Sequence, residues 1–390
     1  MKSLRVGFLC SHDYSDRNAW SGTIYYMYKA LTERNIQVVV LGKPPKKYWL
    51  GQKILNKLCQ KNDSIKIGSP RYIAENNKLA SLVQKQLLET PCDVIFAPVA
   101  KREVAFVKTN TPIVYCSDAT CSLYLKDYKI ELEPEEIELE EREEAIAISK
   151  ASKLVYPSAW AANSAISDYQ AEPNKIKIVP FGANLDDCEL ASAVLSKKQH
   201  QVCRLLFVGK DWDRKGGNLA FDTLICLQKM GIDAELVMVG SKLPEKVRSD
   251  KLTVIPFLNK NDRQQRQQLN ELFFRANFLI FPTRAECYGI VLCEANAFGL
   301  PAIATDVGGI PTIVKNGKNG YMLPLSATGN DYANLIARIF FDRALYNQLV
   351  LSSRAEYETR LNWNKWAESM EEVFVSLVNY NLKQPARSAR

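Results

Sequence analysis

The chain has 390 residues, of which 47% are hydrophobic and 24% charged, and it carries a net charge of +8 at pH 7. This length suits two domains, and the ordinary composition excludes disordered and collagen-like proteins. Ten scattered cysteines without a CxxC pair favour reduced core thiols, and the presence of only two histidines argues against a histidine-based metal site or a Ser-His-Asp triad.

The first half of the chain alternates short apolar runs with segments of helical periodicity. Strands are predicted at residues 4–10, 36–42, 92–98, 112–117, 153–157 and 175–182. Helices are predicted at 22–33, 72–88 and 159–169, and in a glutamate-rich segment that ends at 149. Because the apolar runs are continuous, we expect burial on both faces of a parallel sheet covered by helices. No run is long enough for a membrane span or a signal peptide, so a cytoplasmic protein is expected.

A polar stretch at residues 184–201 is followed by the same alternation. Strands are predicted at 203–209, 234–240, 252–258, 277–282 and 301–306. Helices are predicted at 216–230 and 262–275, around Glu294, and at 361–380. The pattern indicates an α/β protein with two doubly wound domains, 1–183 and 184–360. Residues 361–390 are expected to form a helix that returns to the first domain, followed by a disordered tail after 383.

Basic residues follow the strand at 203–209 in the sequence FVGKDWDRKGG. Lys210, Arg214 and Lys215 lie beside two glycines that open a helix. Their charge, together with the free backbone N–H groups and the dipole of the helix, suits a polyphosphate. A solvated lysine-rich turn explains the same residues equally well.

A second loop and helix carry two carboxylates in FPTRAECYGIVLCEANAFGLPAIATDVGG, residues 281–309. Glu294 lies in an apolar helix, where an unpaired charge would be costly, so it needs a protein partner or a ligand. The hydroxyls of a ribose would satisfy Glu294, while Glu286 could accept hydrogen bonds from other hydroxyls. The alternative is a helix carboxylate paired with a lysine, which the apolar surroundings disfavour.

These loops together resemble the retaining glycosyltransferases of family four, which have the GT-B fold of two Rossmann-like domains facing across a cleft. The family's Glu-x7-Glu motif is matched by Glu286 and Glu294, and its GG-x-P element by residues 308–311. Its Arg-x4-Lys-Gly element is matched by Lys210, in the arginine position, and Lys215. The lysine at 210 loses the planar fork of arginine.

The resemblance implies a role for each matching residue. Lys210 and Lys215 would bind the diphosphate of the donor, Glu286 the hydroxyls of the transferred sugar, and Glu294 the nucleotide ribose. The implied backbone contacts to phosphate and sugar come from Tyr288, Gly289 and Ile290, where tyrosine replaces the family's common phenylalanine.

Two loops of the first domain are implied to complete the site. The loop at 11–23 lacks the GxGxxG pattern of nicotinamide-binding domains. Gly22 matches the family's glycine-rich loop towards the donor, and Asp16 and Trp20 are acceptor-side candidates, although a packed loop with a helix cap is equally compatible. Asp118 stands where many members carry a histidine near the reacting sugar, and a helix cap is its alternative role.

The implied activity is retaining transfer of a hexosyl group from a UDP- or GDP-sugar to a hydroxyl acceptor, in glycan, glycolipid or glycoside biosynthesis. The catalytic candidates are Glu286, Lys215 and Asp118. No cofactor, divalent metal or side-chain nucleophile is expected. Rival interpretations are a catalytically weak GT-B partner subunit and a GT-B enzyme of another reaction type.

The resemblance implies a saccharide or a lipid as the acceptor, and a basic segment bears on this choice. Residues 43–58 (KPPKKYWLGQKILNKL) suit an interfacial helix on anionic lipid at the inner membrane face, or a surface helix packed on the sheet. Nucleic acid is not expected as a partner, because no binding motif accompanies the basic residues 43–71. The run of nine glutamates at 131–144 is expected to be a solvated helix face.

Overall fold

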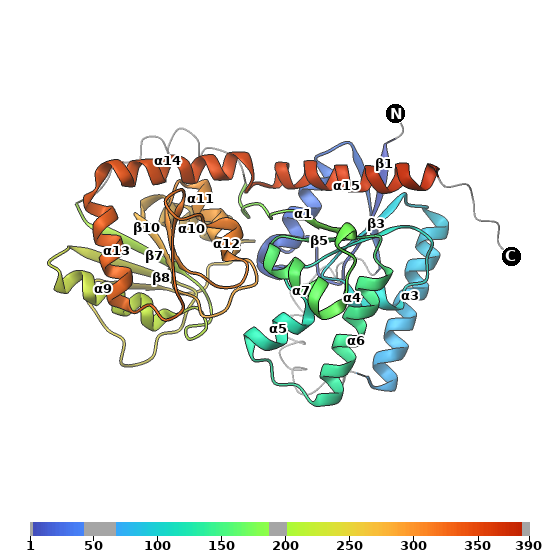
Figure 1. The fold of residues 1–390 in the computed structure, drawn as a ribbon, viewed down its shortest axis with the longest axis horizontal. Coiled ribbons are helices and arrows are strands. Elements are labelled where there is room, and N and C mark those ends of the chain that lie inside the picture. The colour runs from blue at the N-terminus through green and yellow to red at the C-terminus, as the bar shows by residue number, and fades with distance from the viewer. Residues whose placement is uncertain (1–2, 43–67, 187–200, 384–390) are drawn as a thin grey trace. The chain divides into compact units, whose positions relative to one another are not determined.

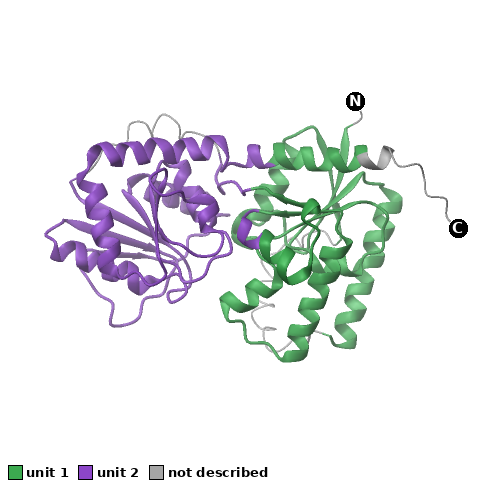
Figure 2. Ribbon diagram, viewed as in Figure 1, with its two compact units in different colours: residues 1–156, 162–179, 367–390 green, residues 157–161, 180–366 purple. Residues whose placement is uncertain are grey.

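The computed structural model describes residues 3–42, 68–186 and 201–383 (Figure 1). The basic segment at 43–58 and the tail after 383 therefore lie outside the described residues. Two compact units divide the chain (Figure 2): unit 1 holds residues 1–156, 162–179 and 367–390, and unit 2 holds 157–161 and 180–366. The domain boundaries after residues 183 and 360 stay predictions.

Unit 1 is built on a parallel sheet in the order β2-β1-β3-β4-β5-β6. Its strands are β1 (Leu4–Leu9), β2 (Ile36–Leu41), β3 (Val94–Pro98), β4 (Ile113–Cys116), β5 (Lys153–Tyr156) and β6 (Ile176–Ile178). Its helices are η1 (Ala19–Gly22), α1 (Thr23–Thr32), α3 (Pro70–Glu89), α4 (Lys101–Phe106), α5 (Cys121–Tyr128), α6 (Pro134–Lys150), most of α7 (Ala159–Tyr169), η2 (Pro173–Lys175) and most of α15 (Trp363–Lys383). Every residue of β3 and β4 is buried, as the continuous apolar runs predict.

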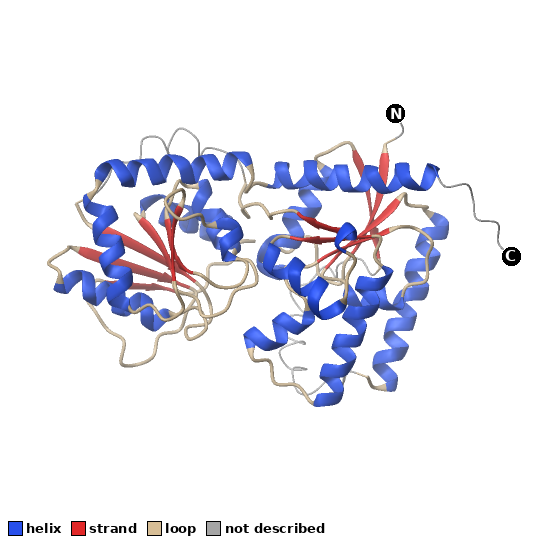
Figure 3. Ribbon diagram, in the orientation of Figure 1, coloured by secondary structure: helices blue, strands red, loops and turns tan. Residues whose placement is uncertain are grey.

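Unit 2 repeats this architecture with the order β12-β11-β10-β7-β8-β9. Its strands are β7 (Cys203–Val208), β8 (Ala234–Val239), β9 (Leu252–Ile255), β10 (Phe278–Phe281), β11 (Ala302–Thr305) and β12 (Gly320–Leu323). Its helices are α9 (Gly217–Lys229), α10 (Arg263–Arg275), α11 (Ile290–Ala297), α12 (Ile310–Ile313), α13 (Gly329–Phe341) and α14 (Arg343–Thr359). Helices flank each of the two sheets (Figure 3), and the expected α/β class is confirmed.

The strand orders show where each sheet opens for a ligand. In unit 1 the chain steps from β1 to β2 on one side and then to β3 on the other. In unit 2 it steps from β7 through β8 to β9, and then returns to place β10 on the other side of β7. Loops that leave the carboxyl ends of two such strands diverge, which leaves a crevice for ligands. The basic loop after β7 and the Glu286 loop after β10 therefore start side by side.

The C-terminal helix α15 packs on unit 1 through its later turns. Glu371 accepts a hydrogen bond from the Arg34 side chain at 2.6 Å, and the ring of Phe374 lies 5.8 Å from that of Phe96 on β3. These contacts join the end of the chain to the first sheet.

The glutamate-rich helix α6 is not the solvated face that its composition predicts. Glu143 and Glu144 are each only 2% exposed. The hydroxyl of Tyr72 donates to Glu143 at 2.8 Å, and that of Tyr115 donates to Glu144 at 3.1 Å. Burial raises the pKa of Glu144 to about 7, although Lys101 and the Tyr115 hydroxyl lower it. The prediction is wrong for these two residues because α3, α4 and β4 supply partners from elsewhere in the sequence.

Candidate functional site

Two loops meet at the carboxyl end of the second sheet. Gly216, at the start of α9, has a φ of 75°, and a Cβ there would lie 2.0 Å from the Pro282 carbonyl oxygen. Glycine is therefore required for the basic loop to approach the end of β10. The backbone N–H of Arg284 donates to the Arg214 carbonyl at 2.7 Å, and the Thr283 hydroxyl donates to the same oxygen at 3.1 Å. The two predicted donor-binding loops thus form one structure.

Lys215 and Glu286, the two catalytic candidates of this unit, form an ion pair. Their side chains are 14% and 11% exposed, and the Lys215 ammonium also lies 4.7 Å from the centre of the Phe281 ring. A pair with little access to water is strongly coupled. A ligand that carries both an anionic group and hydroxyls can contact the Lys215 ammonium and the Glu286 carboxylate at the same time.

Lys210 lies on the exposed edge of the same loop. Its ammonium is 4.0 Å from the centre of the Phe257 ring, which follows β9 and is 46% exposed. Between the two lysines, Arg214 donates a hydrogen bond to the Ala285 carbonyl at 3.1 Å. The loop therefore presents one lysine paired with a carboxylate and one held over an aromatic ring.

Glu294 is only 2% exposed, and it has a protein partner. Lys260, in the loop between β9 and α10, forms an ion pair with it. Burial raises the pKa of Glu294, and the Lys260 charge and hydrogen bond lower it. The apolar surroundings therefore did not exclude a lysine partner, and that part of the sequence interpretation is wrong. The signal for Lys260 was its place just after a strand, at the end of the sheet where ligands bind.

The segment between the two glutamates is shaped by glycines. Gly289, the N-cap of α11, has a φ of 93°. Gly308 has a φ of 55°, and a Cβ there would lie 1.8 Å from the Glu286 carbonyl oxygen. Tyr288 is 2% exposed, and its hydroxyl donates to the Phe181 carbonyl at 3.1 Å. The side chain of Tyr288 therefore faces the core and is not available to a ligand.

The remaining predicted residues belong to unit 1. Gly22 caps α1 with a φ of 96°, and it follows two left-handed residues, Trp20 and Ser21, with φ of 46° and 60°. The Asp16 carboxylate accepts the backbone N–H of Asn18 at 2.9 Å, so it caps its own turn. Asp118 is half-buried just after β4. These residues lie at the carboxyl ends of β1 and β4.

Residues 3–42, 68–186 and 201–383 contain no group of three or more His, Cys, Asp and Glu side chains that could hold a metal ion. None of the helices in these ranges combines the length and apolarity that crossing a bilayer requires.

Residues 202–342 match the family described as Glycosyl transferases group 1. The D-inositol 3-phosphate glycosyltransferase of Acidothermus cellulolyticus is 28% identical over 250 residues, which are 59% of this chain and 54% of that protein. The protein of the same name from Streptomyces bingchenggensis is 25% identical over 244 residues, 58% of this chain and 53% of the relative. The chain thus spans about half the length of the curated relatives it matches.

Solved structures resemble the whole chain. A sucrose-phosphate synthase from Thermosynechococcus elongatus has a TM-score of 0.68 at 17% identity, covering 97% of this chain and 100% of that one. Anabaena HepE in complex with UDP-glucose has a TM-score of 0.64 at 16% identity, covering 96% and 100%. At such identities the likeness shows the fold alone, and that fold is GT-B, as expected.

Proposed function

We propose that this chain, whose residues 202–342 match the group 1 glycosyl transferases, is a retaining hexosyltransferase. The donor is a nucleoside-diphosphate sugar, and the acceptor is a hydroxyl group of a saccharide or lipid. The observation that carries the proposal is the ion pair of Lys215 with Glu286 at the carboxyl end of the unit 2 sheet. A transferred sugar bound through a diphosphate presents negative charge and hydroxyls together, and this pair can bind both.

Each candidate site residue of unit 2 has a distinct role in the proposed reaction. The bond between the anomeric carbon and the diphosphate oxygen breaks, and the acceptor oxygen bonds to that carbon on the same face of the sugar. The proton of the acceptor hydroxyl passes to the leaving phosphate, so no side-chain nucleophile is needed. Lys215 and Lys210 stabilise the charge that develops on the diphosphate, and Glu286 accepts hydrogen bonds from the sugar.

The ion pair of Glu294 with Lys260 is compatible with a ribose contact. A carboxylate has two oxygens with about four lone-pair sites, and one ammonium occupies only part of this capacity. Lys260 favours the ionised form of Glu294 against the cost of burial, so that the carboxylate can accept bonds from both ribose hydroxyls. Metal-independent transfer follows from the lysines, which supply the positive charge.

UDP-sugars are the first donors to test, because HepE binds UDP and UDP-glucose, and GDP-sugars are the second. Thermal shift and donor hydrolysis would be measured with UDP-, GDP- and ADP-sugars on the wild type, Lys215→Ala and Glu286→Ala. Lys229→Ala, an exposed change at the end of α9, is the matched control. A donor that stabilises the wild type and the control, and is hydrolysed by them but not by the two site variants, supports the proposal. If no nucleotide sugar shifts the melting temperature, the partner-subunit alternative takes its place.

We further propose a cytoplasmic enzyme that touches the inner membrane face through residues 43–58, a segment outside the described residues. Its mixture of lysines with Tyr48, Trp49 and Leu50 supports this contact. Sedimentation with anionic vesicles at low salt is the test. If the protein does not bind these vesicles, the membrane contact is refuted, and a saccharide is then favoured over a lipid as the acceptor.

A further inference from the structure

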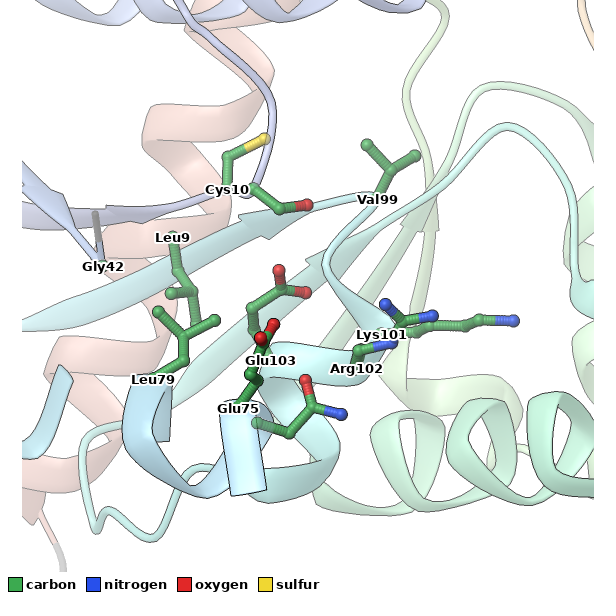
Figure 4. A pocket seen from close by; sticks show the side chains of 11 residues that line it. Leu9, Cys10, Gly42, Glu75, Leu79, Val99, Lys101, Arg102 and Glu103 are labelled. Atoms are coloured by element: carbon green, nitrogen blue, oxygen red, sulfur yellow. The ribbon is translucent and has the colours of Figure 1, made fainter. Parts of the chain in front are cut away.

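Tyr288 lies inside the predicted donor loop, yet its side chain is only 2% exposed and faces away from any ligand. It differs in this from the side chains at the ends of β1 and β3 and on α3 and α4, which line a pocket of about 380 Å³ in unit 1 (Figure 4). Tyr288 stands between Glu286 and Gly289, the N-cap of α11. Any effect of its side chain on a bound donor must therefore pass through the backbone.

The hydroxyl of Tyr288 is anchored on Phe181, which is distant in the sequence. It donates a hydrogen bond to the Phe181 carbonyl at 3.1 Å, and the two rings meet edge-on with their centres 5.2 Å apart. The Cys293 thiol lies 3.6 Å from the same carbonyl oxygen. Burial raises the pKa of Tyr288 well above its ordinary value, so the hydroxyl keeps its proton and remains a donor.

Phe181 belongs to one of two segments that stand at the ends of the main stretch of unit 2. Residues 180–184, the entry segment, begin this stretch, and residues 361–366, the exit segment, end it. The backbone N–H of Ala183 donates to the Leu361 carbonyl at 2.9 Å. The entry and exit segments are thereby bound to each other.

Trp363 of the exit segment strengthens this attachment through its side chain. Its ring stacks on that of Phe181, with the centres 6.0 Å apart and 22° between the planes, and its Nε1 donates to the Asn184 side-chain oxygen at 3.1 Å. Gly182 permits the close approach, because a Cβ there would lie 2.3 Å from the Trp363 backbone nitrogen. The carbonyl that accepts from Tyr288 is therefore held by a well-packed segment.

A second connection joins the exit segment to the start of the donor loop. Arg360, directly before the exit segment, donates to the Thr312 and Ile313 carbonyls at 2.8 Å each, at the end of α12. Gly309, the N-cap of α12, donates its backbone N–H to the Glu286 carbonyl at 3.3 Å. Loss of the Tyr288 anchor would therefore loosen the donor loop without releasing it.

We propose that Tyr288 is a positioning residue for the donor. Its side chain, anchored on the entry segment, holds the backbone of residues 286–290 in the conformation that contacts the diphosphate and the transferred sugar. The inference rests on the proposed transferase function. It gives a role to the tyrosine that replaces the family's common phenylalanine, since phenylalanine cannot donate to the Phe181 carbonyl. Because coupling between two sites is reciprocal, a bound donor should also stabilise the entry segment.

The test compares nucleotide binding to the full-length wild type and Tyr288→Phe by isothermal titration calorimetry, with UDP, and with GDP if UDP does not bind. Tyr346→Phe is the matched control. Tyr346 is 1% exposed, and its hydroxyl also donates to a main-chain carbonyl, that of Asn277 at 3.3 Å, at the amino end of β10. Hydrogen-exchange mass spectrometry of the peptide 181–184 and the kinetics of donor hydrolysis are the further measurements. Far-UV circular dichroism confirms that each variant is folded at the assay temperature.

We expect Tyr288→Phe to bind the nucleotide about fivefold more weakly than the wild type, because the loss of one hydrogen bond lowers the population of the binding-competent loop. The donor KM should rise by a similar factor while kcat changes little, since the loop holds the donor in the ground state and the transition state alike. Nucleotide should slow exchange in the peptide 181–184 of the wild type and of Tyr346→Phe, and less so in Tyr288→Phe.

The proposal is overturned if Tyr288→Phe binds the nucleotide as tightly as the wild type, even when its melting temperature is lower, because the hydroxyl then serves stability alone. It is also overturned if Tyr346→Phe weakens binding as much, or if nucleotide leaves exchange of the peptide 181–184 unchanged in the wild type. If the wild type binds neither nucleotide, the proposed transferase function is itself refuted, and the positioning role of Tyr288 is refuted with it.

Discussion

Replacing Lys260 with methionine removes the partner of a fully buried carboxylate. The substitution keeps most of the side-chain volume and deletes the charge that pairs with Glu294. Removal of one member of a buried ion pair costs roughly 3–5 kcal/mol, because the other charge is left uncompensated. Glu294 is 2% exposed, but Lys260 retains 17% exposure, so some solvent can enter. We therefore expect the free energy of unfolding to fall by about 3 kcal/mol near neutral pH.

The loss of unfolding free energy in Lys260→Met should depend on pH in a defined direction. Burial already raises the pKa of Glu294 when Lys260 is present. Removal of the Lys260 charge raises the pKa of Glu294 further. A carboxyl group whose pKa is higher in the folded than in the unfolded state contributes stability at low pH, which is lost as pH rises through the folded pKa. Lys260→Met should therefore be destabilised more at about pH 8 than at about pH 5, where Glu294 can take up a proton.

Urea denaturation at the two pH values measures both effects, with Lys246→Met, an exposed lysine of the same unit, as the control. The double variant Lys260→Met with Glu294→Gln should recover most of the loss, because no buried charge remains. An equal loss at both pH values, or a loss no larger than that of the control, would refute the reasoning. UDP should also bind Lys260→Met more weakly, because Glu294 is then partly protonated.

Three further predictions concern other parts of the chain. Lys215→Ala should lower kcat/KM for transfer by about 100-fold or more, because the leaving diphosphate loses a preorganised positive charge; steady-state kinetics that match the wild type would contradict this. Gly308→Ala should lower the free energy of unfolding by roughly 1–3 kcal/mol, since its Cβ would meet the Glu286 carbonyl oxygen at 1.8 Å, and an unchanged melting temperature would count against it. Glu144 has a folded pKa of about 7, so it should cost stability as pH rises from about 4.5 to above 7. The free energy of unfolding of Glu144→Gln, measured by urea denaturation, should then exceed that of the wild type by about 3 kcal/mol near pH 8 and by little near pH 4. The same gain at both pH values would contradict the raised pKa of Glu144.

The sequence by itself determined the two parallel sheets and the end of the second sheet at which Lys215 and Glu286 lie. Short apolar runs without alternation, such as residues 278–281, are typical of strands covered on both faces, and the structure confirms them as strands of two six-stranded sheets. The positions of Lys215 and Glu286 just after strands placed both at the ligand-binding end of one sheet. Their ion pair is consistent with that placement.

Only the tertiary structure decided which side chains meet. Lys260 pairs with Glu294 across 34 residues of sequence, Glu144 finds Tyr115 on another element, and Asn76 and Glu103 come together in one pocket from different helices. Local periodicity reports how a segment distributes its apolar side chains between its faces. It carries no information about which element covers that face. The partner of a buried charge depends on strand order and helix packing, and these arise only when the whole chain has folded.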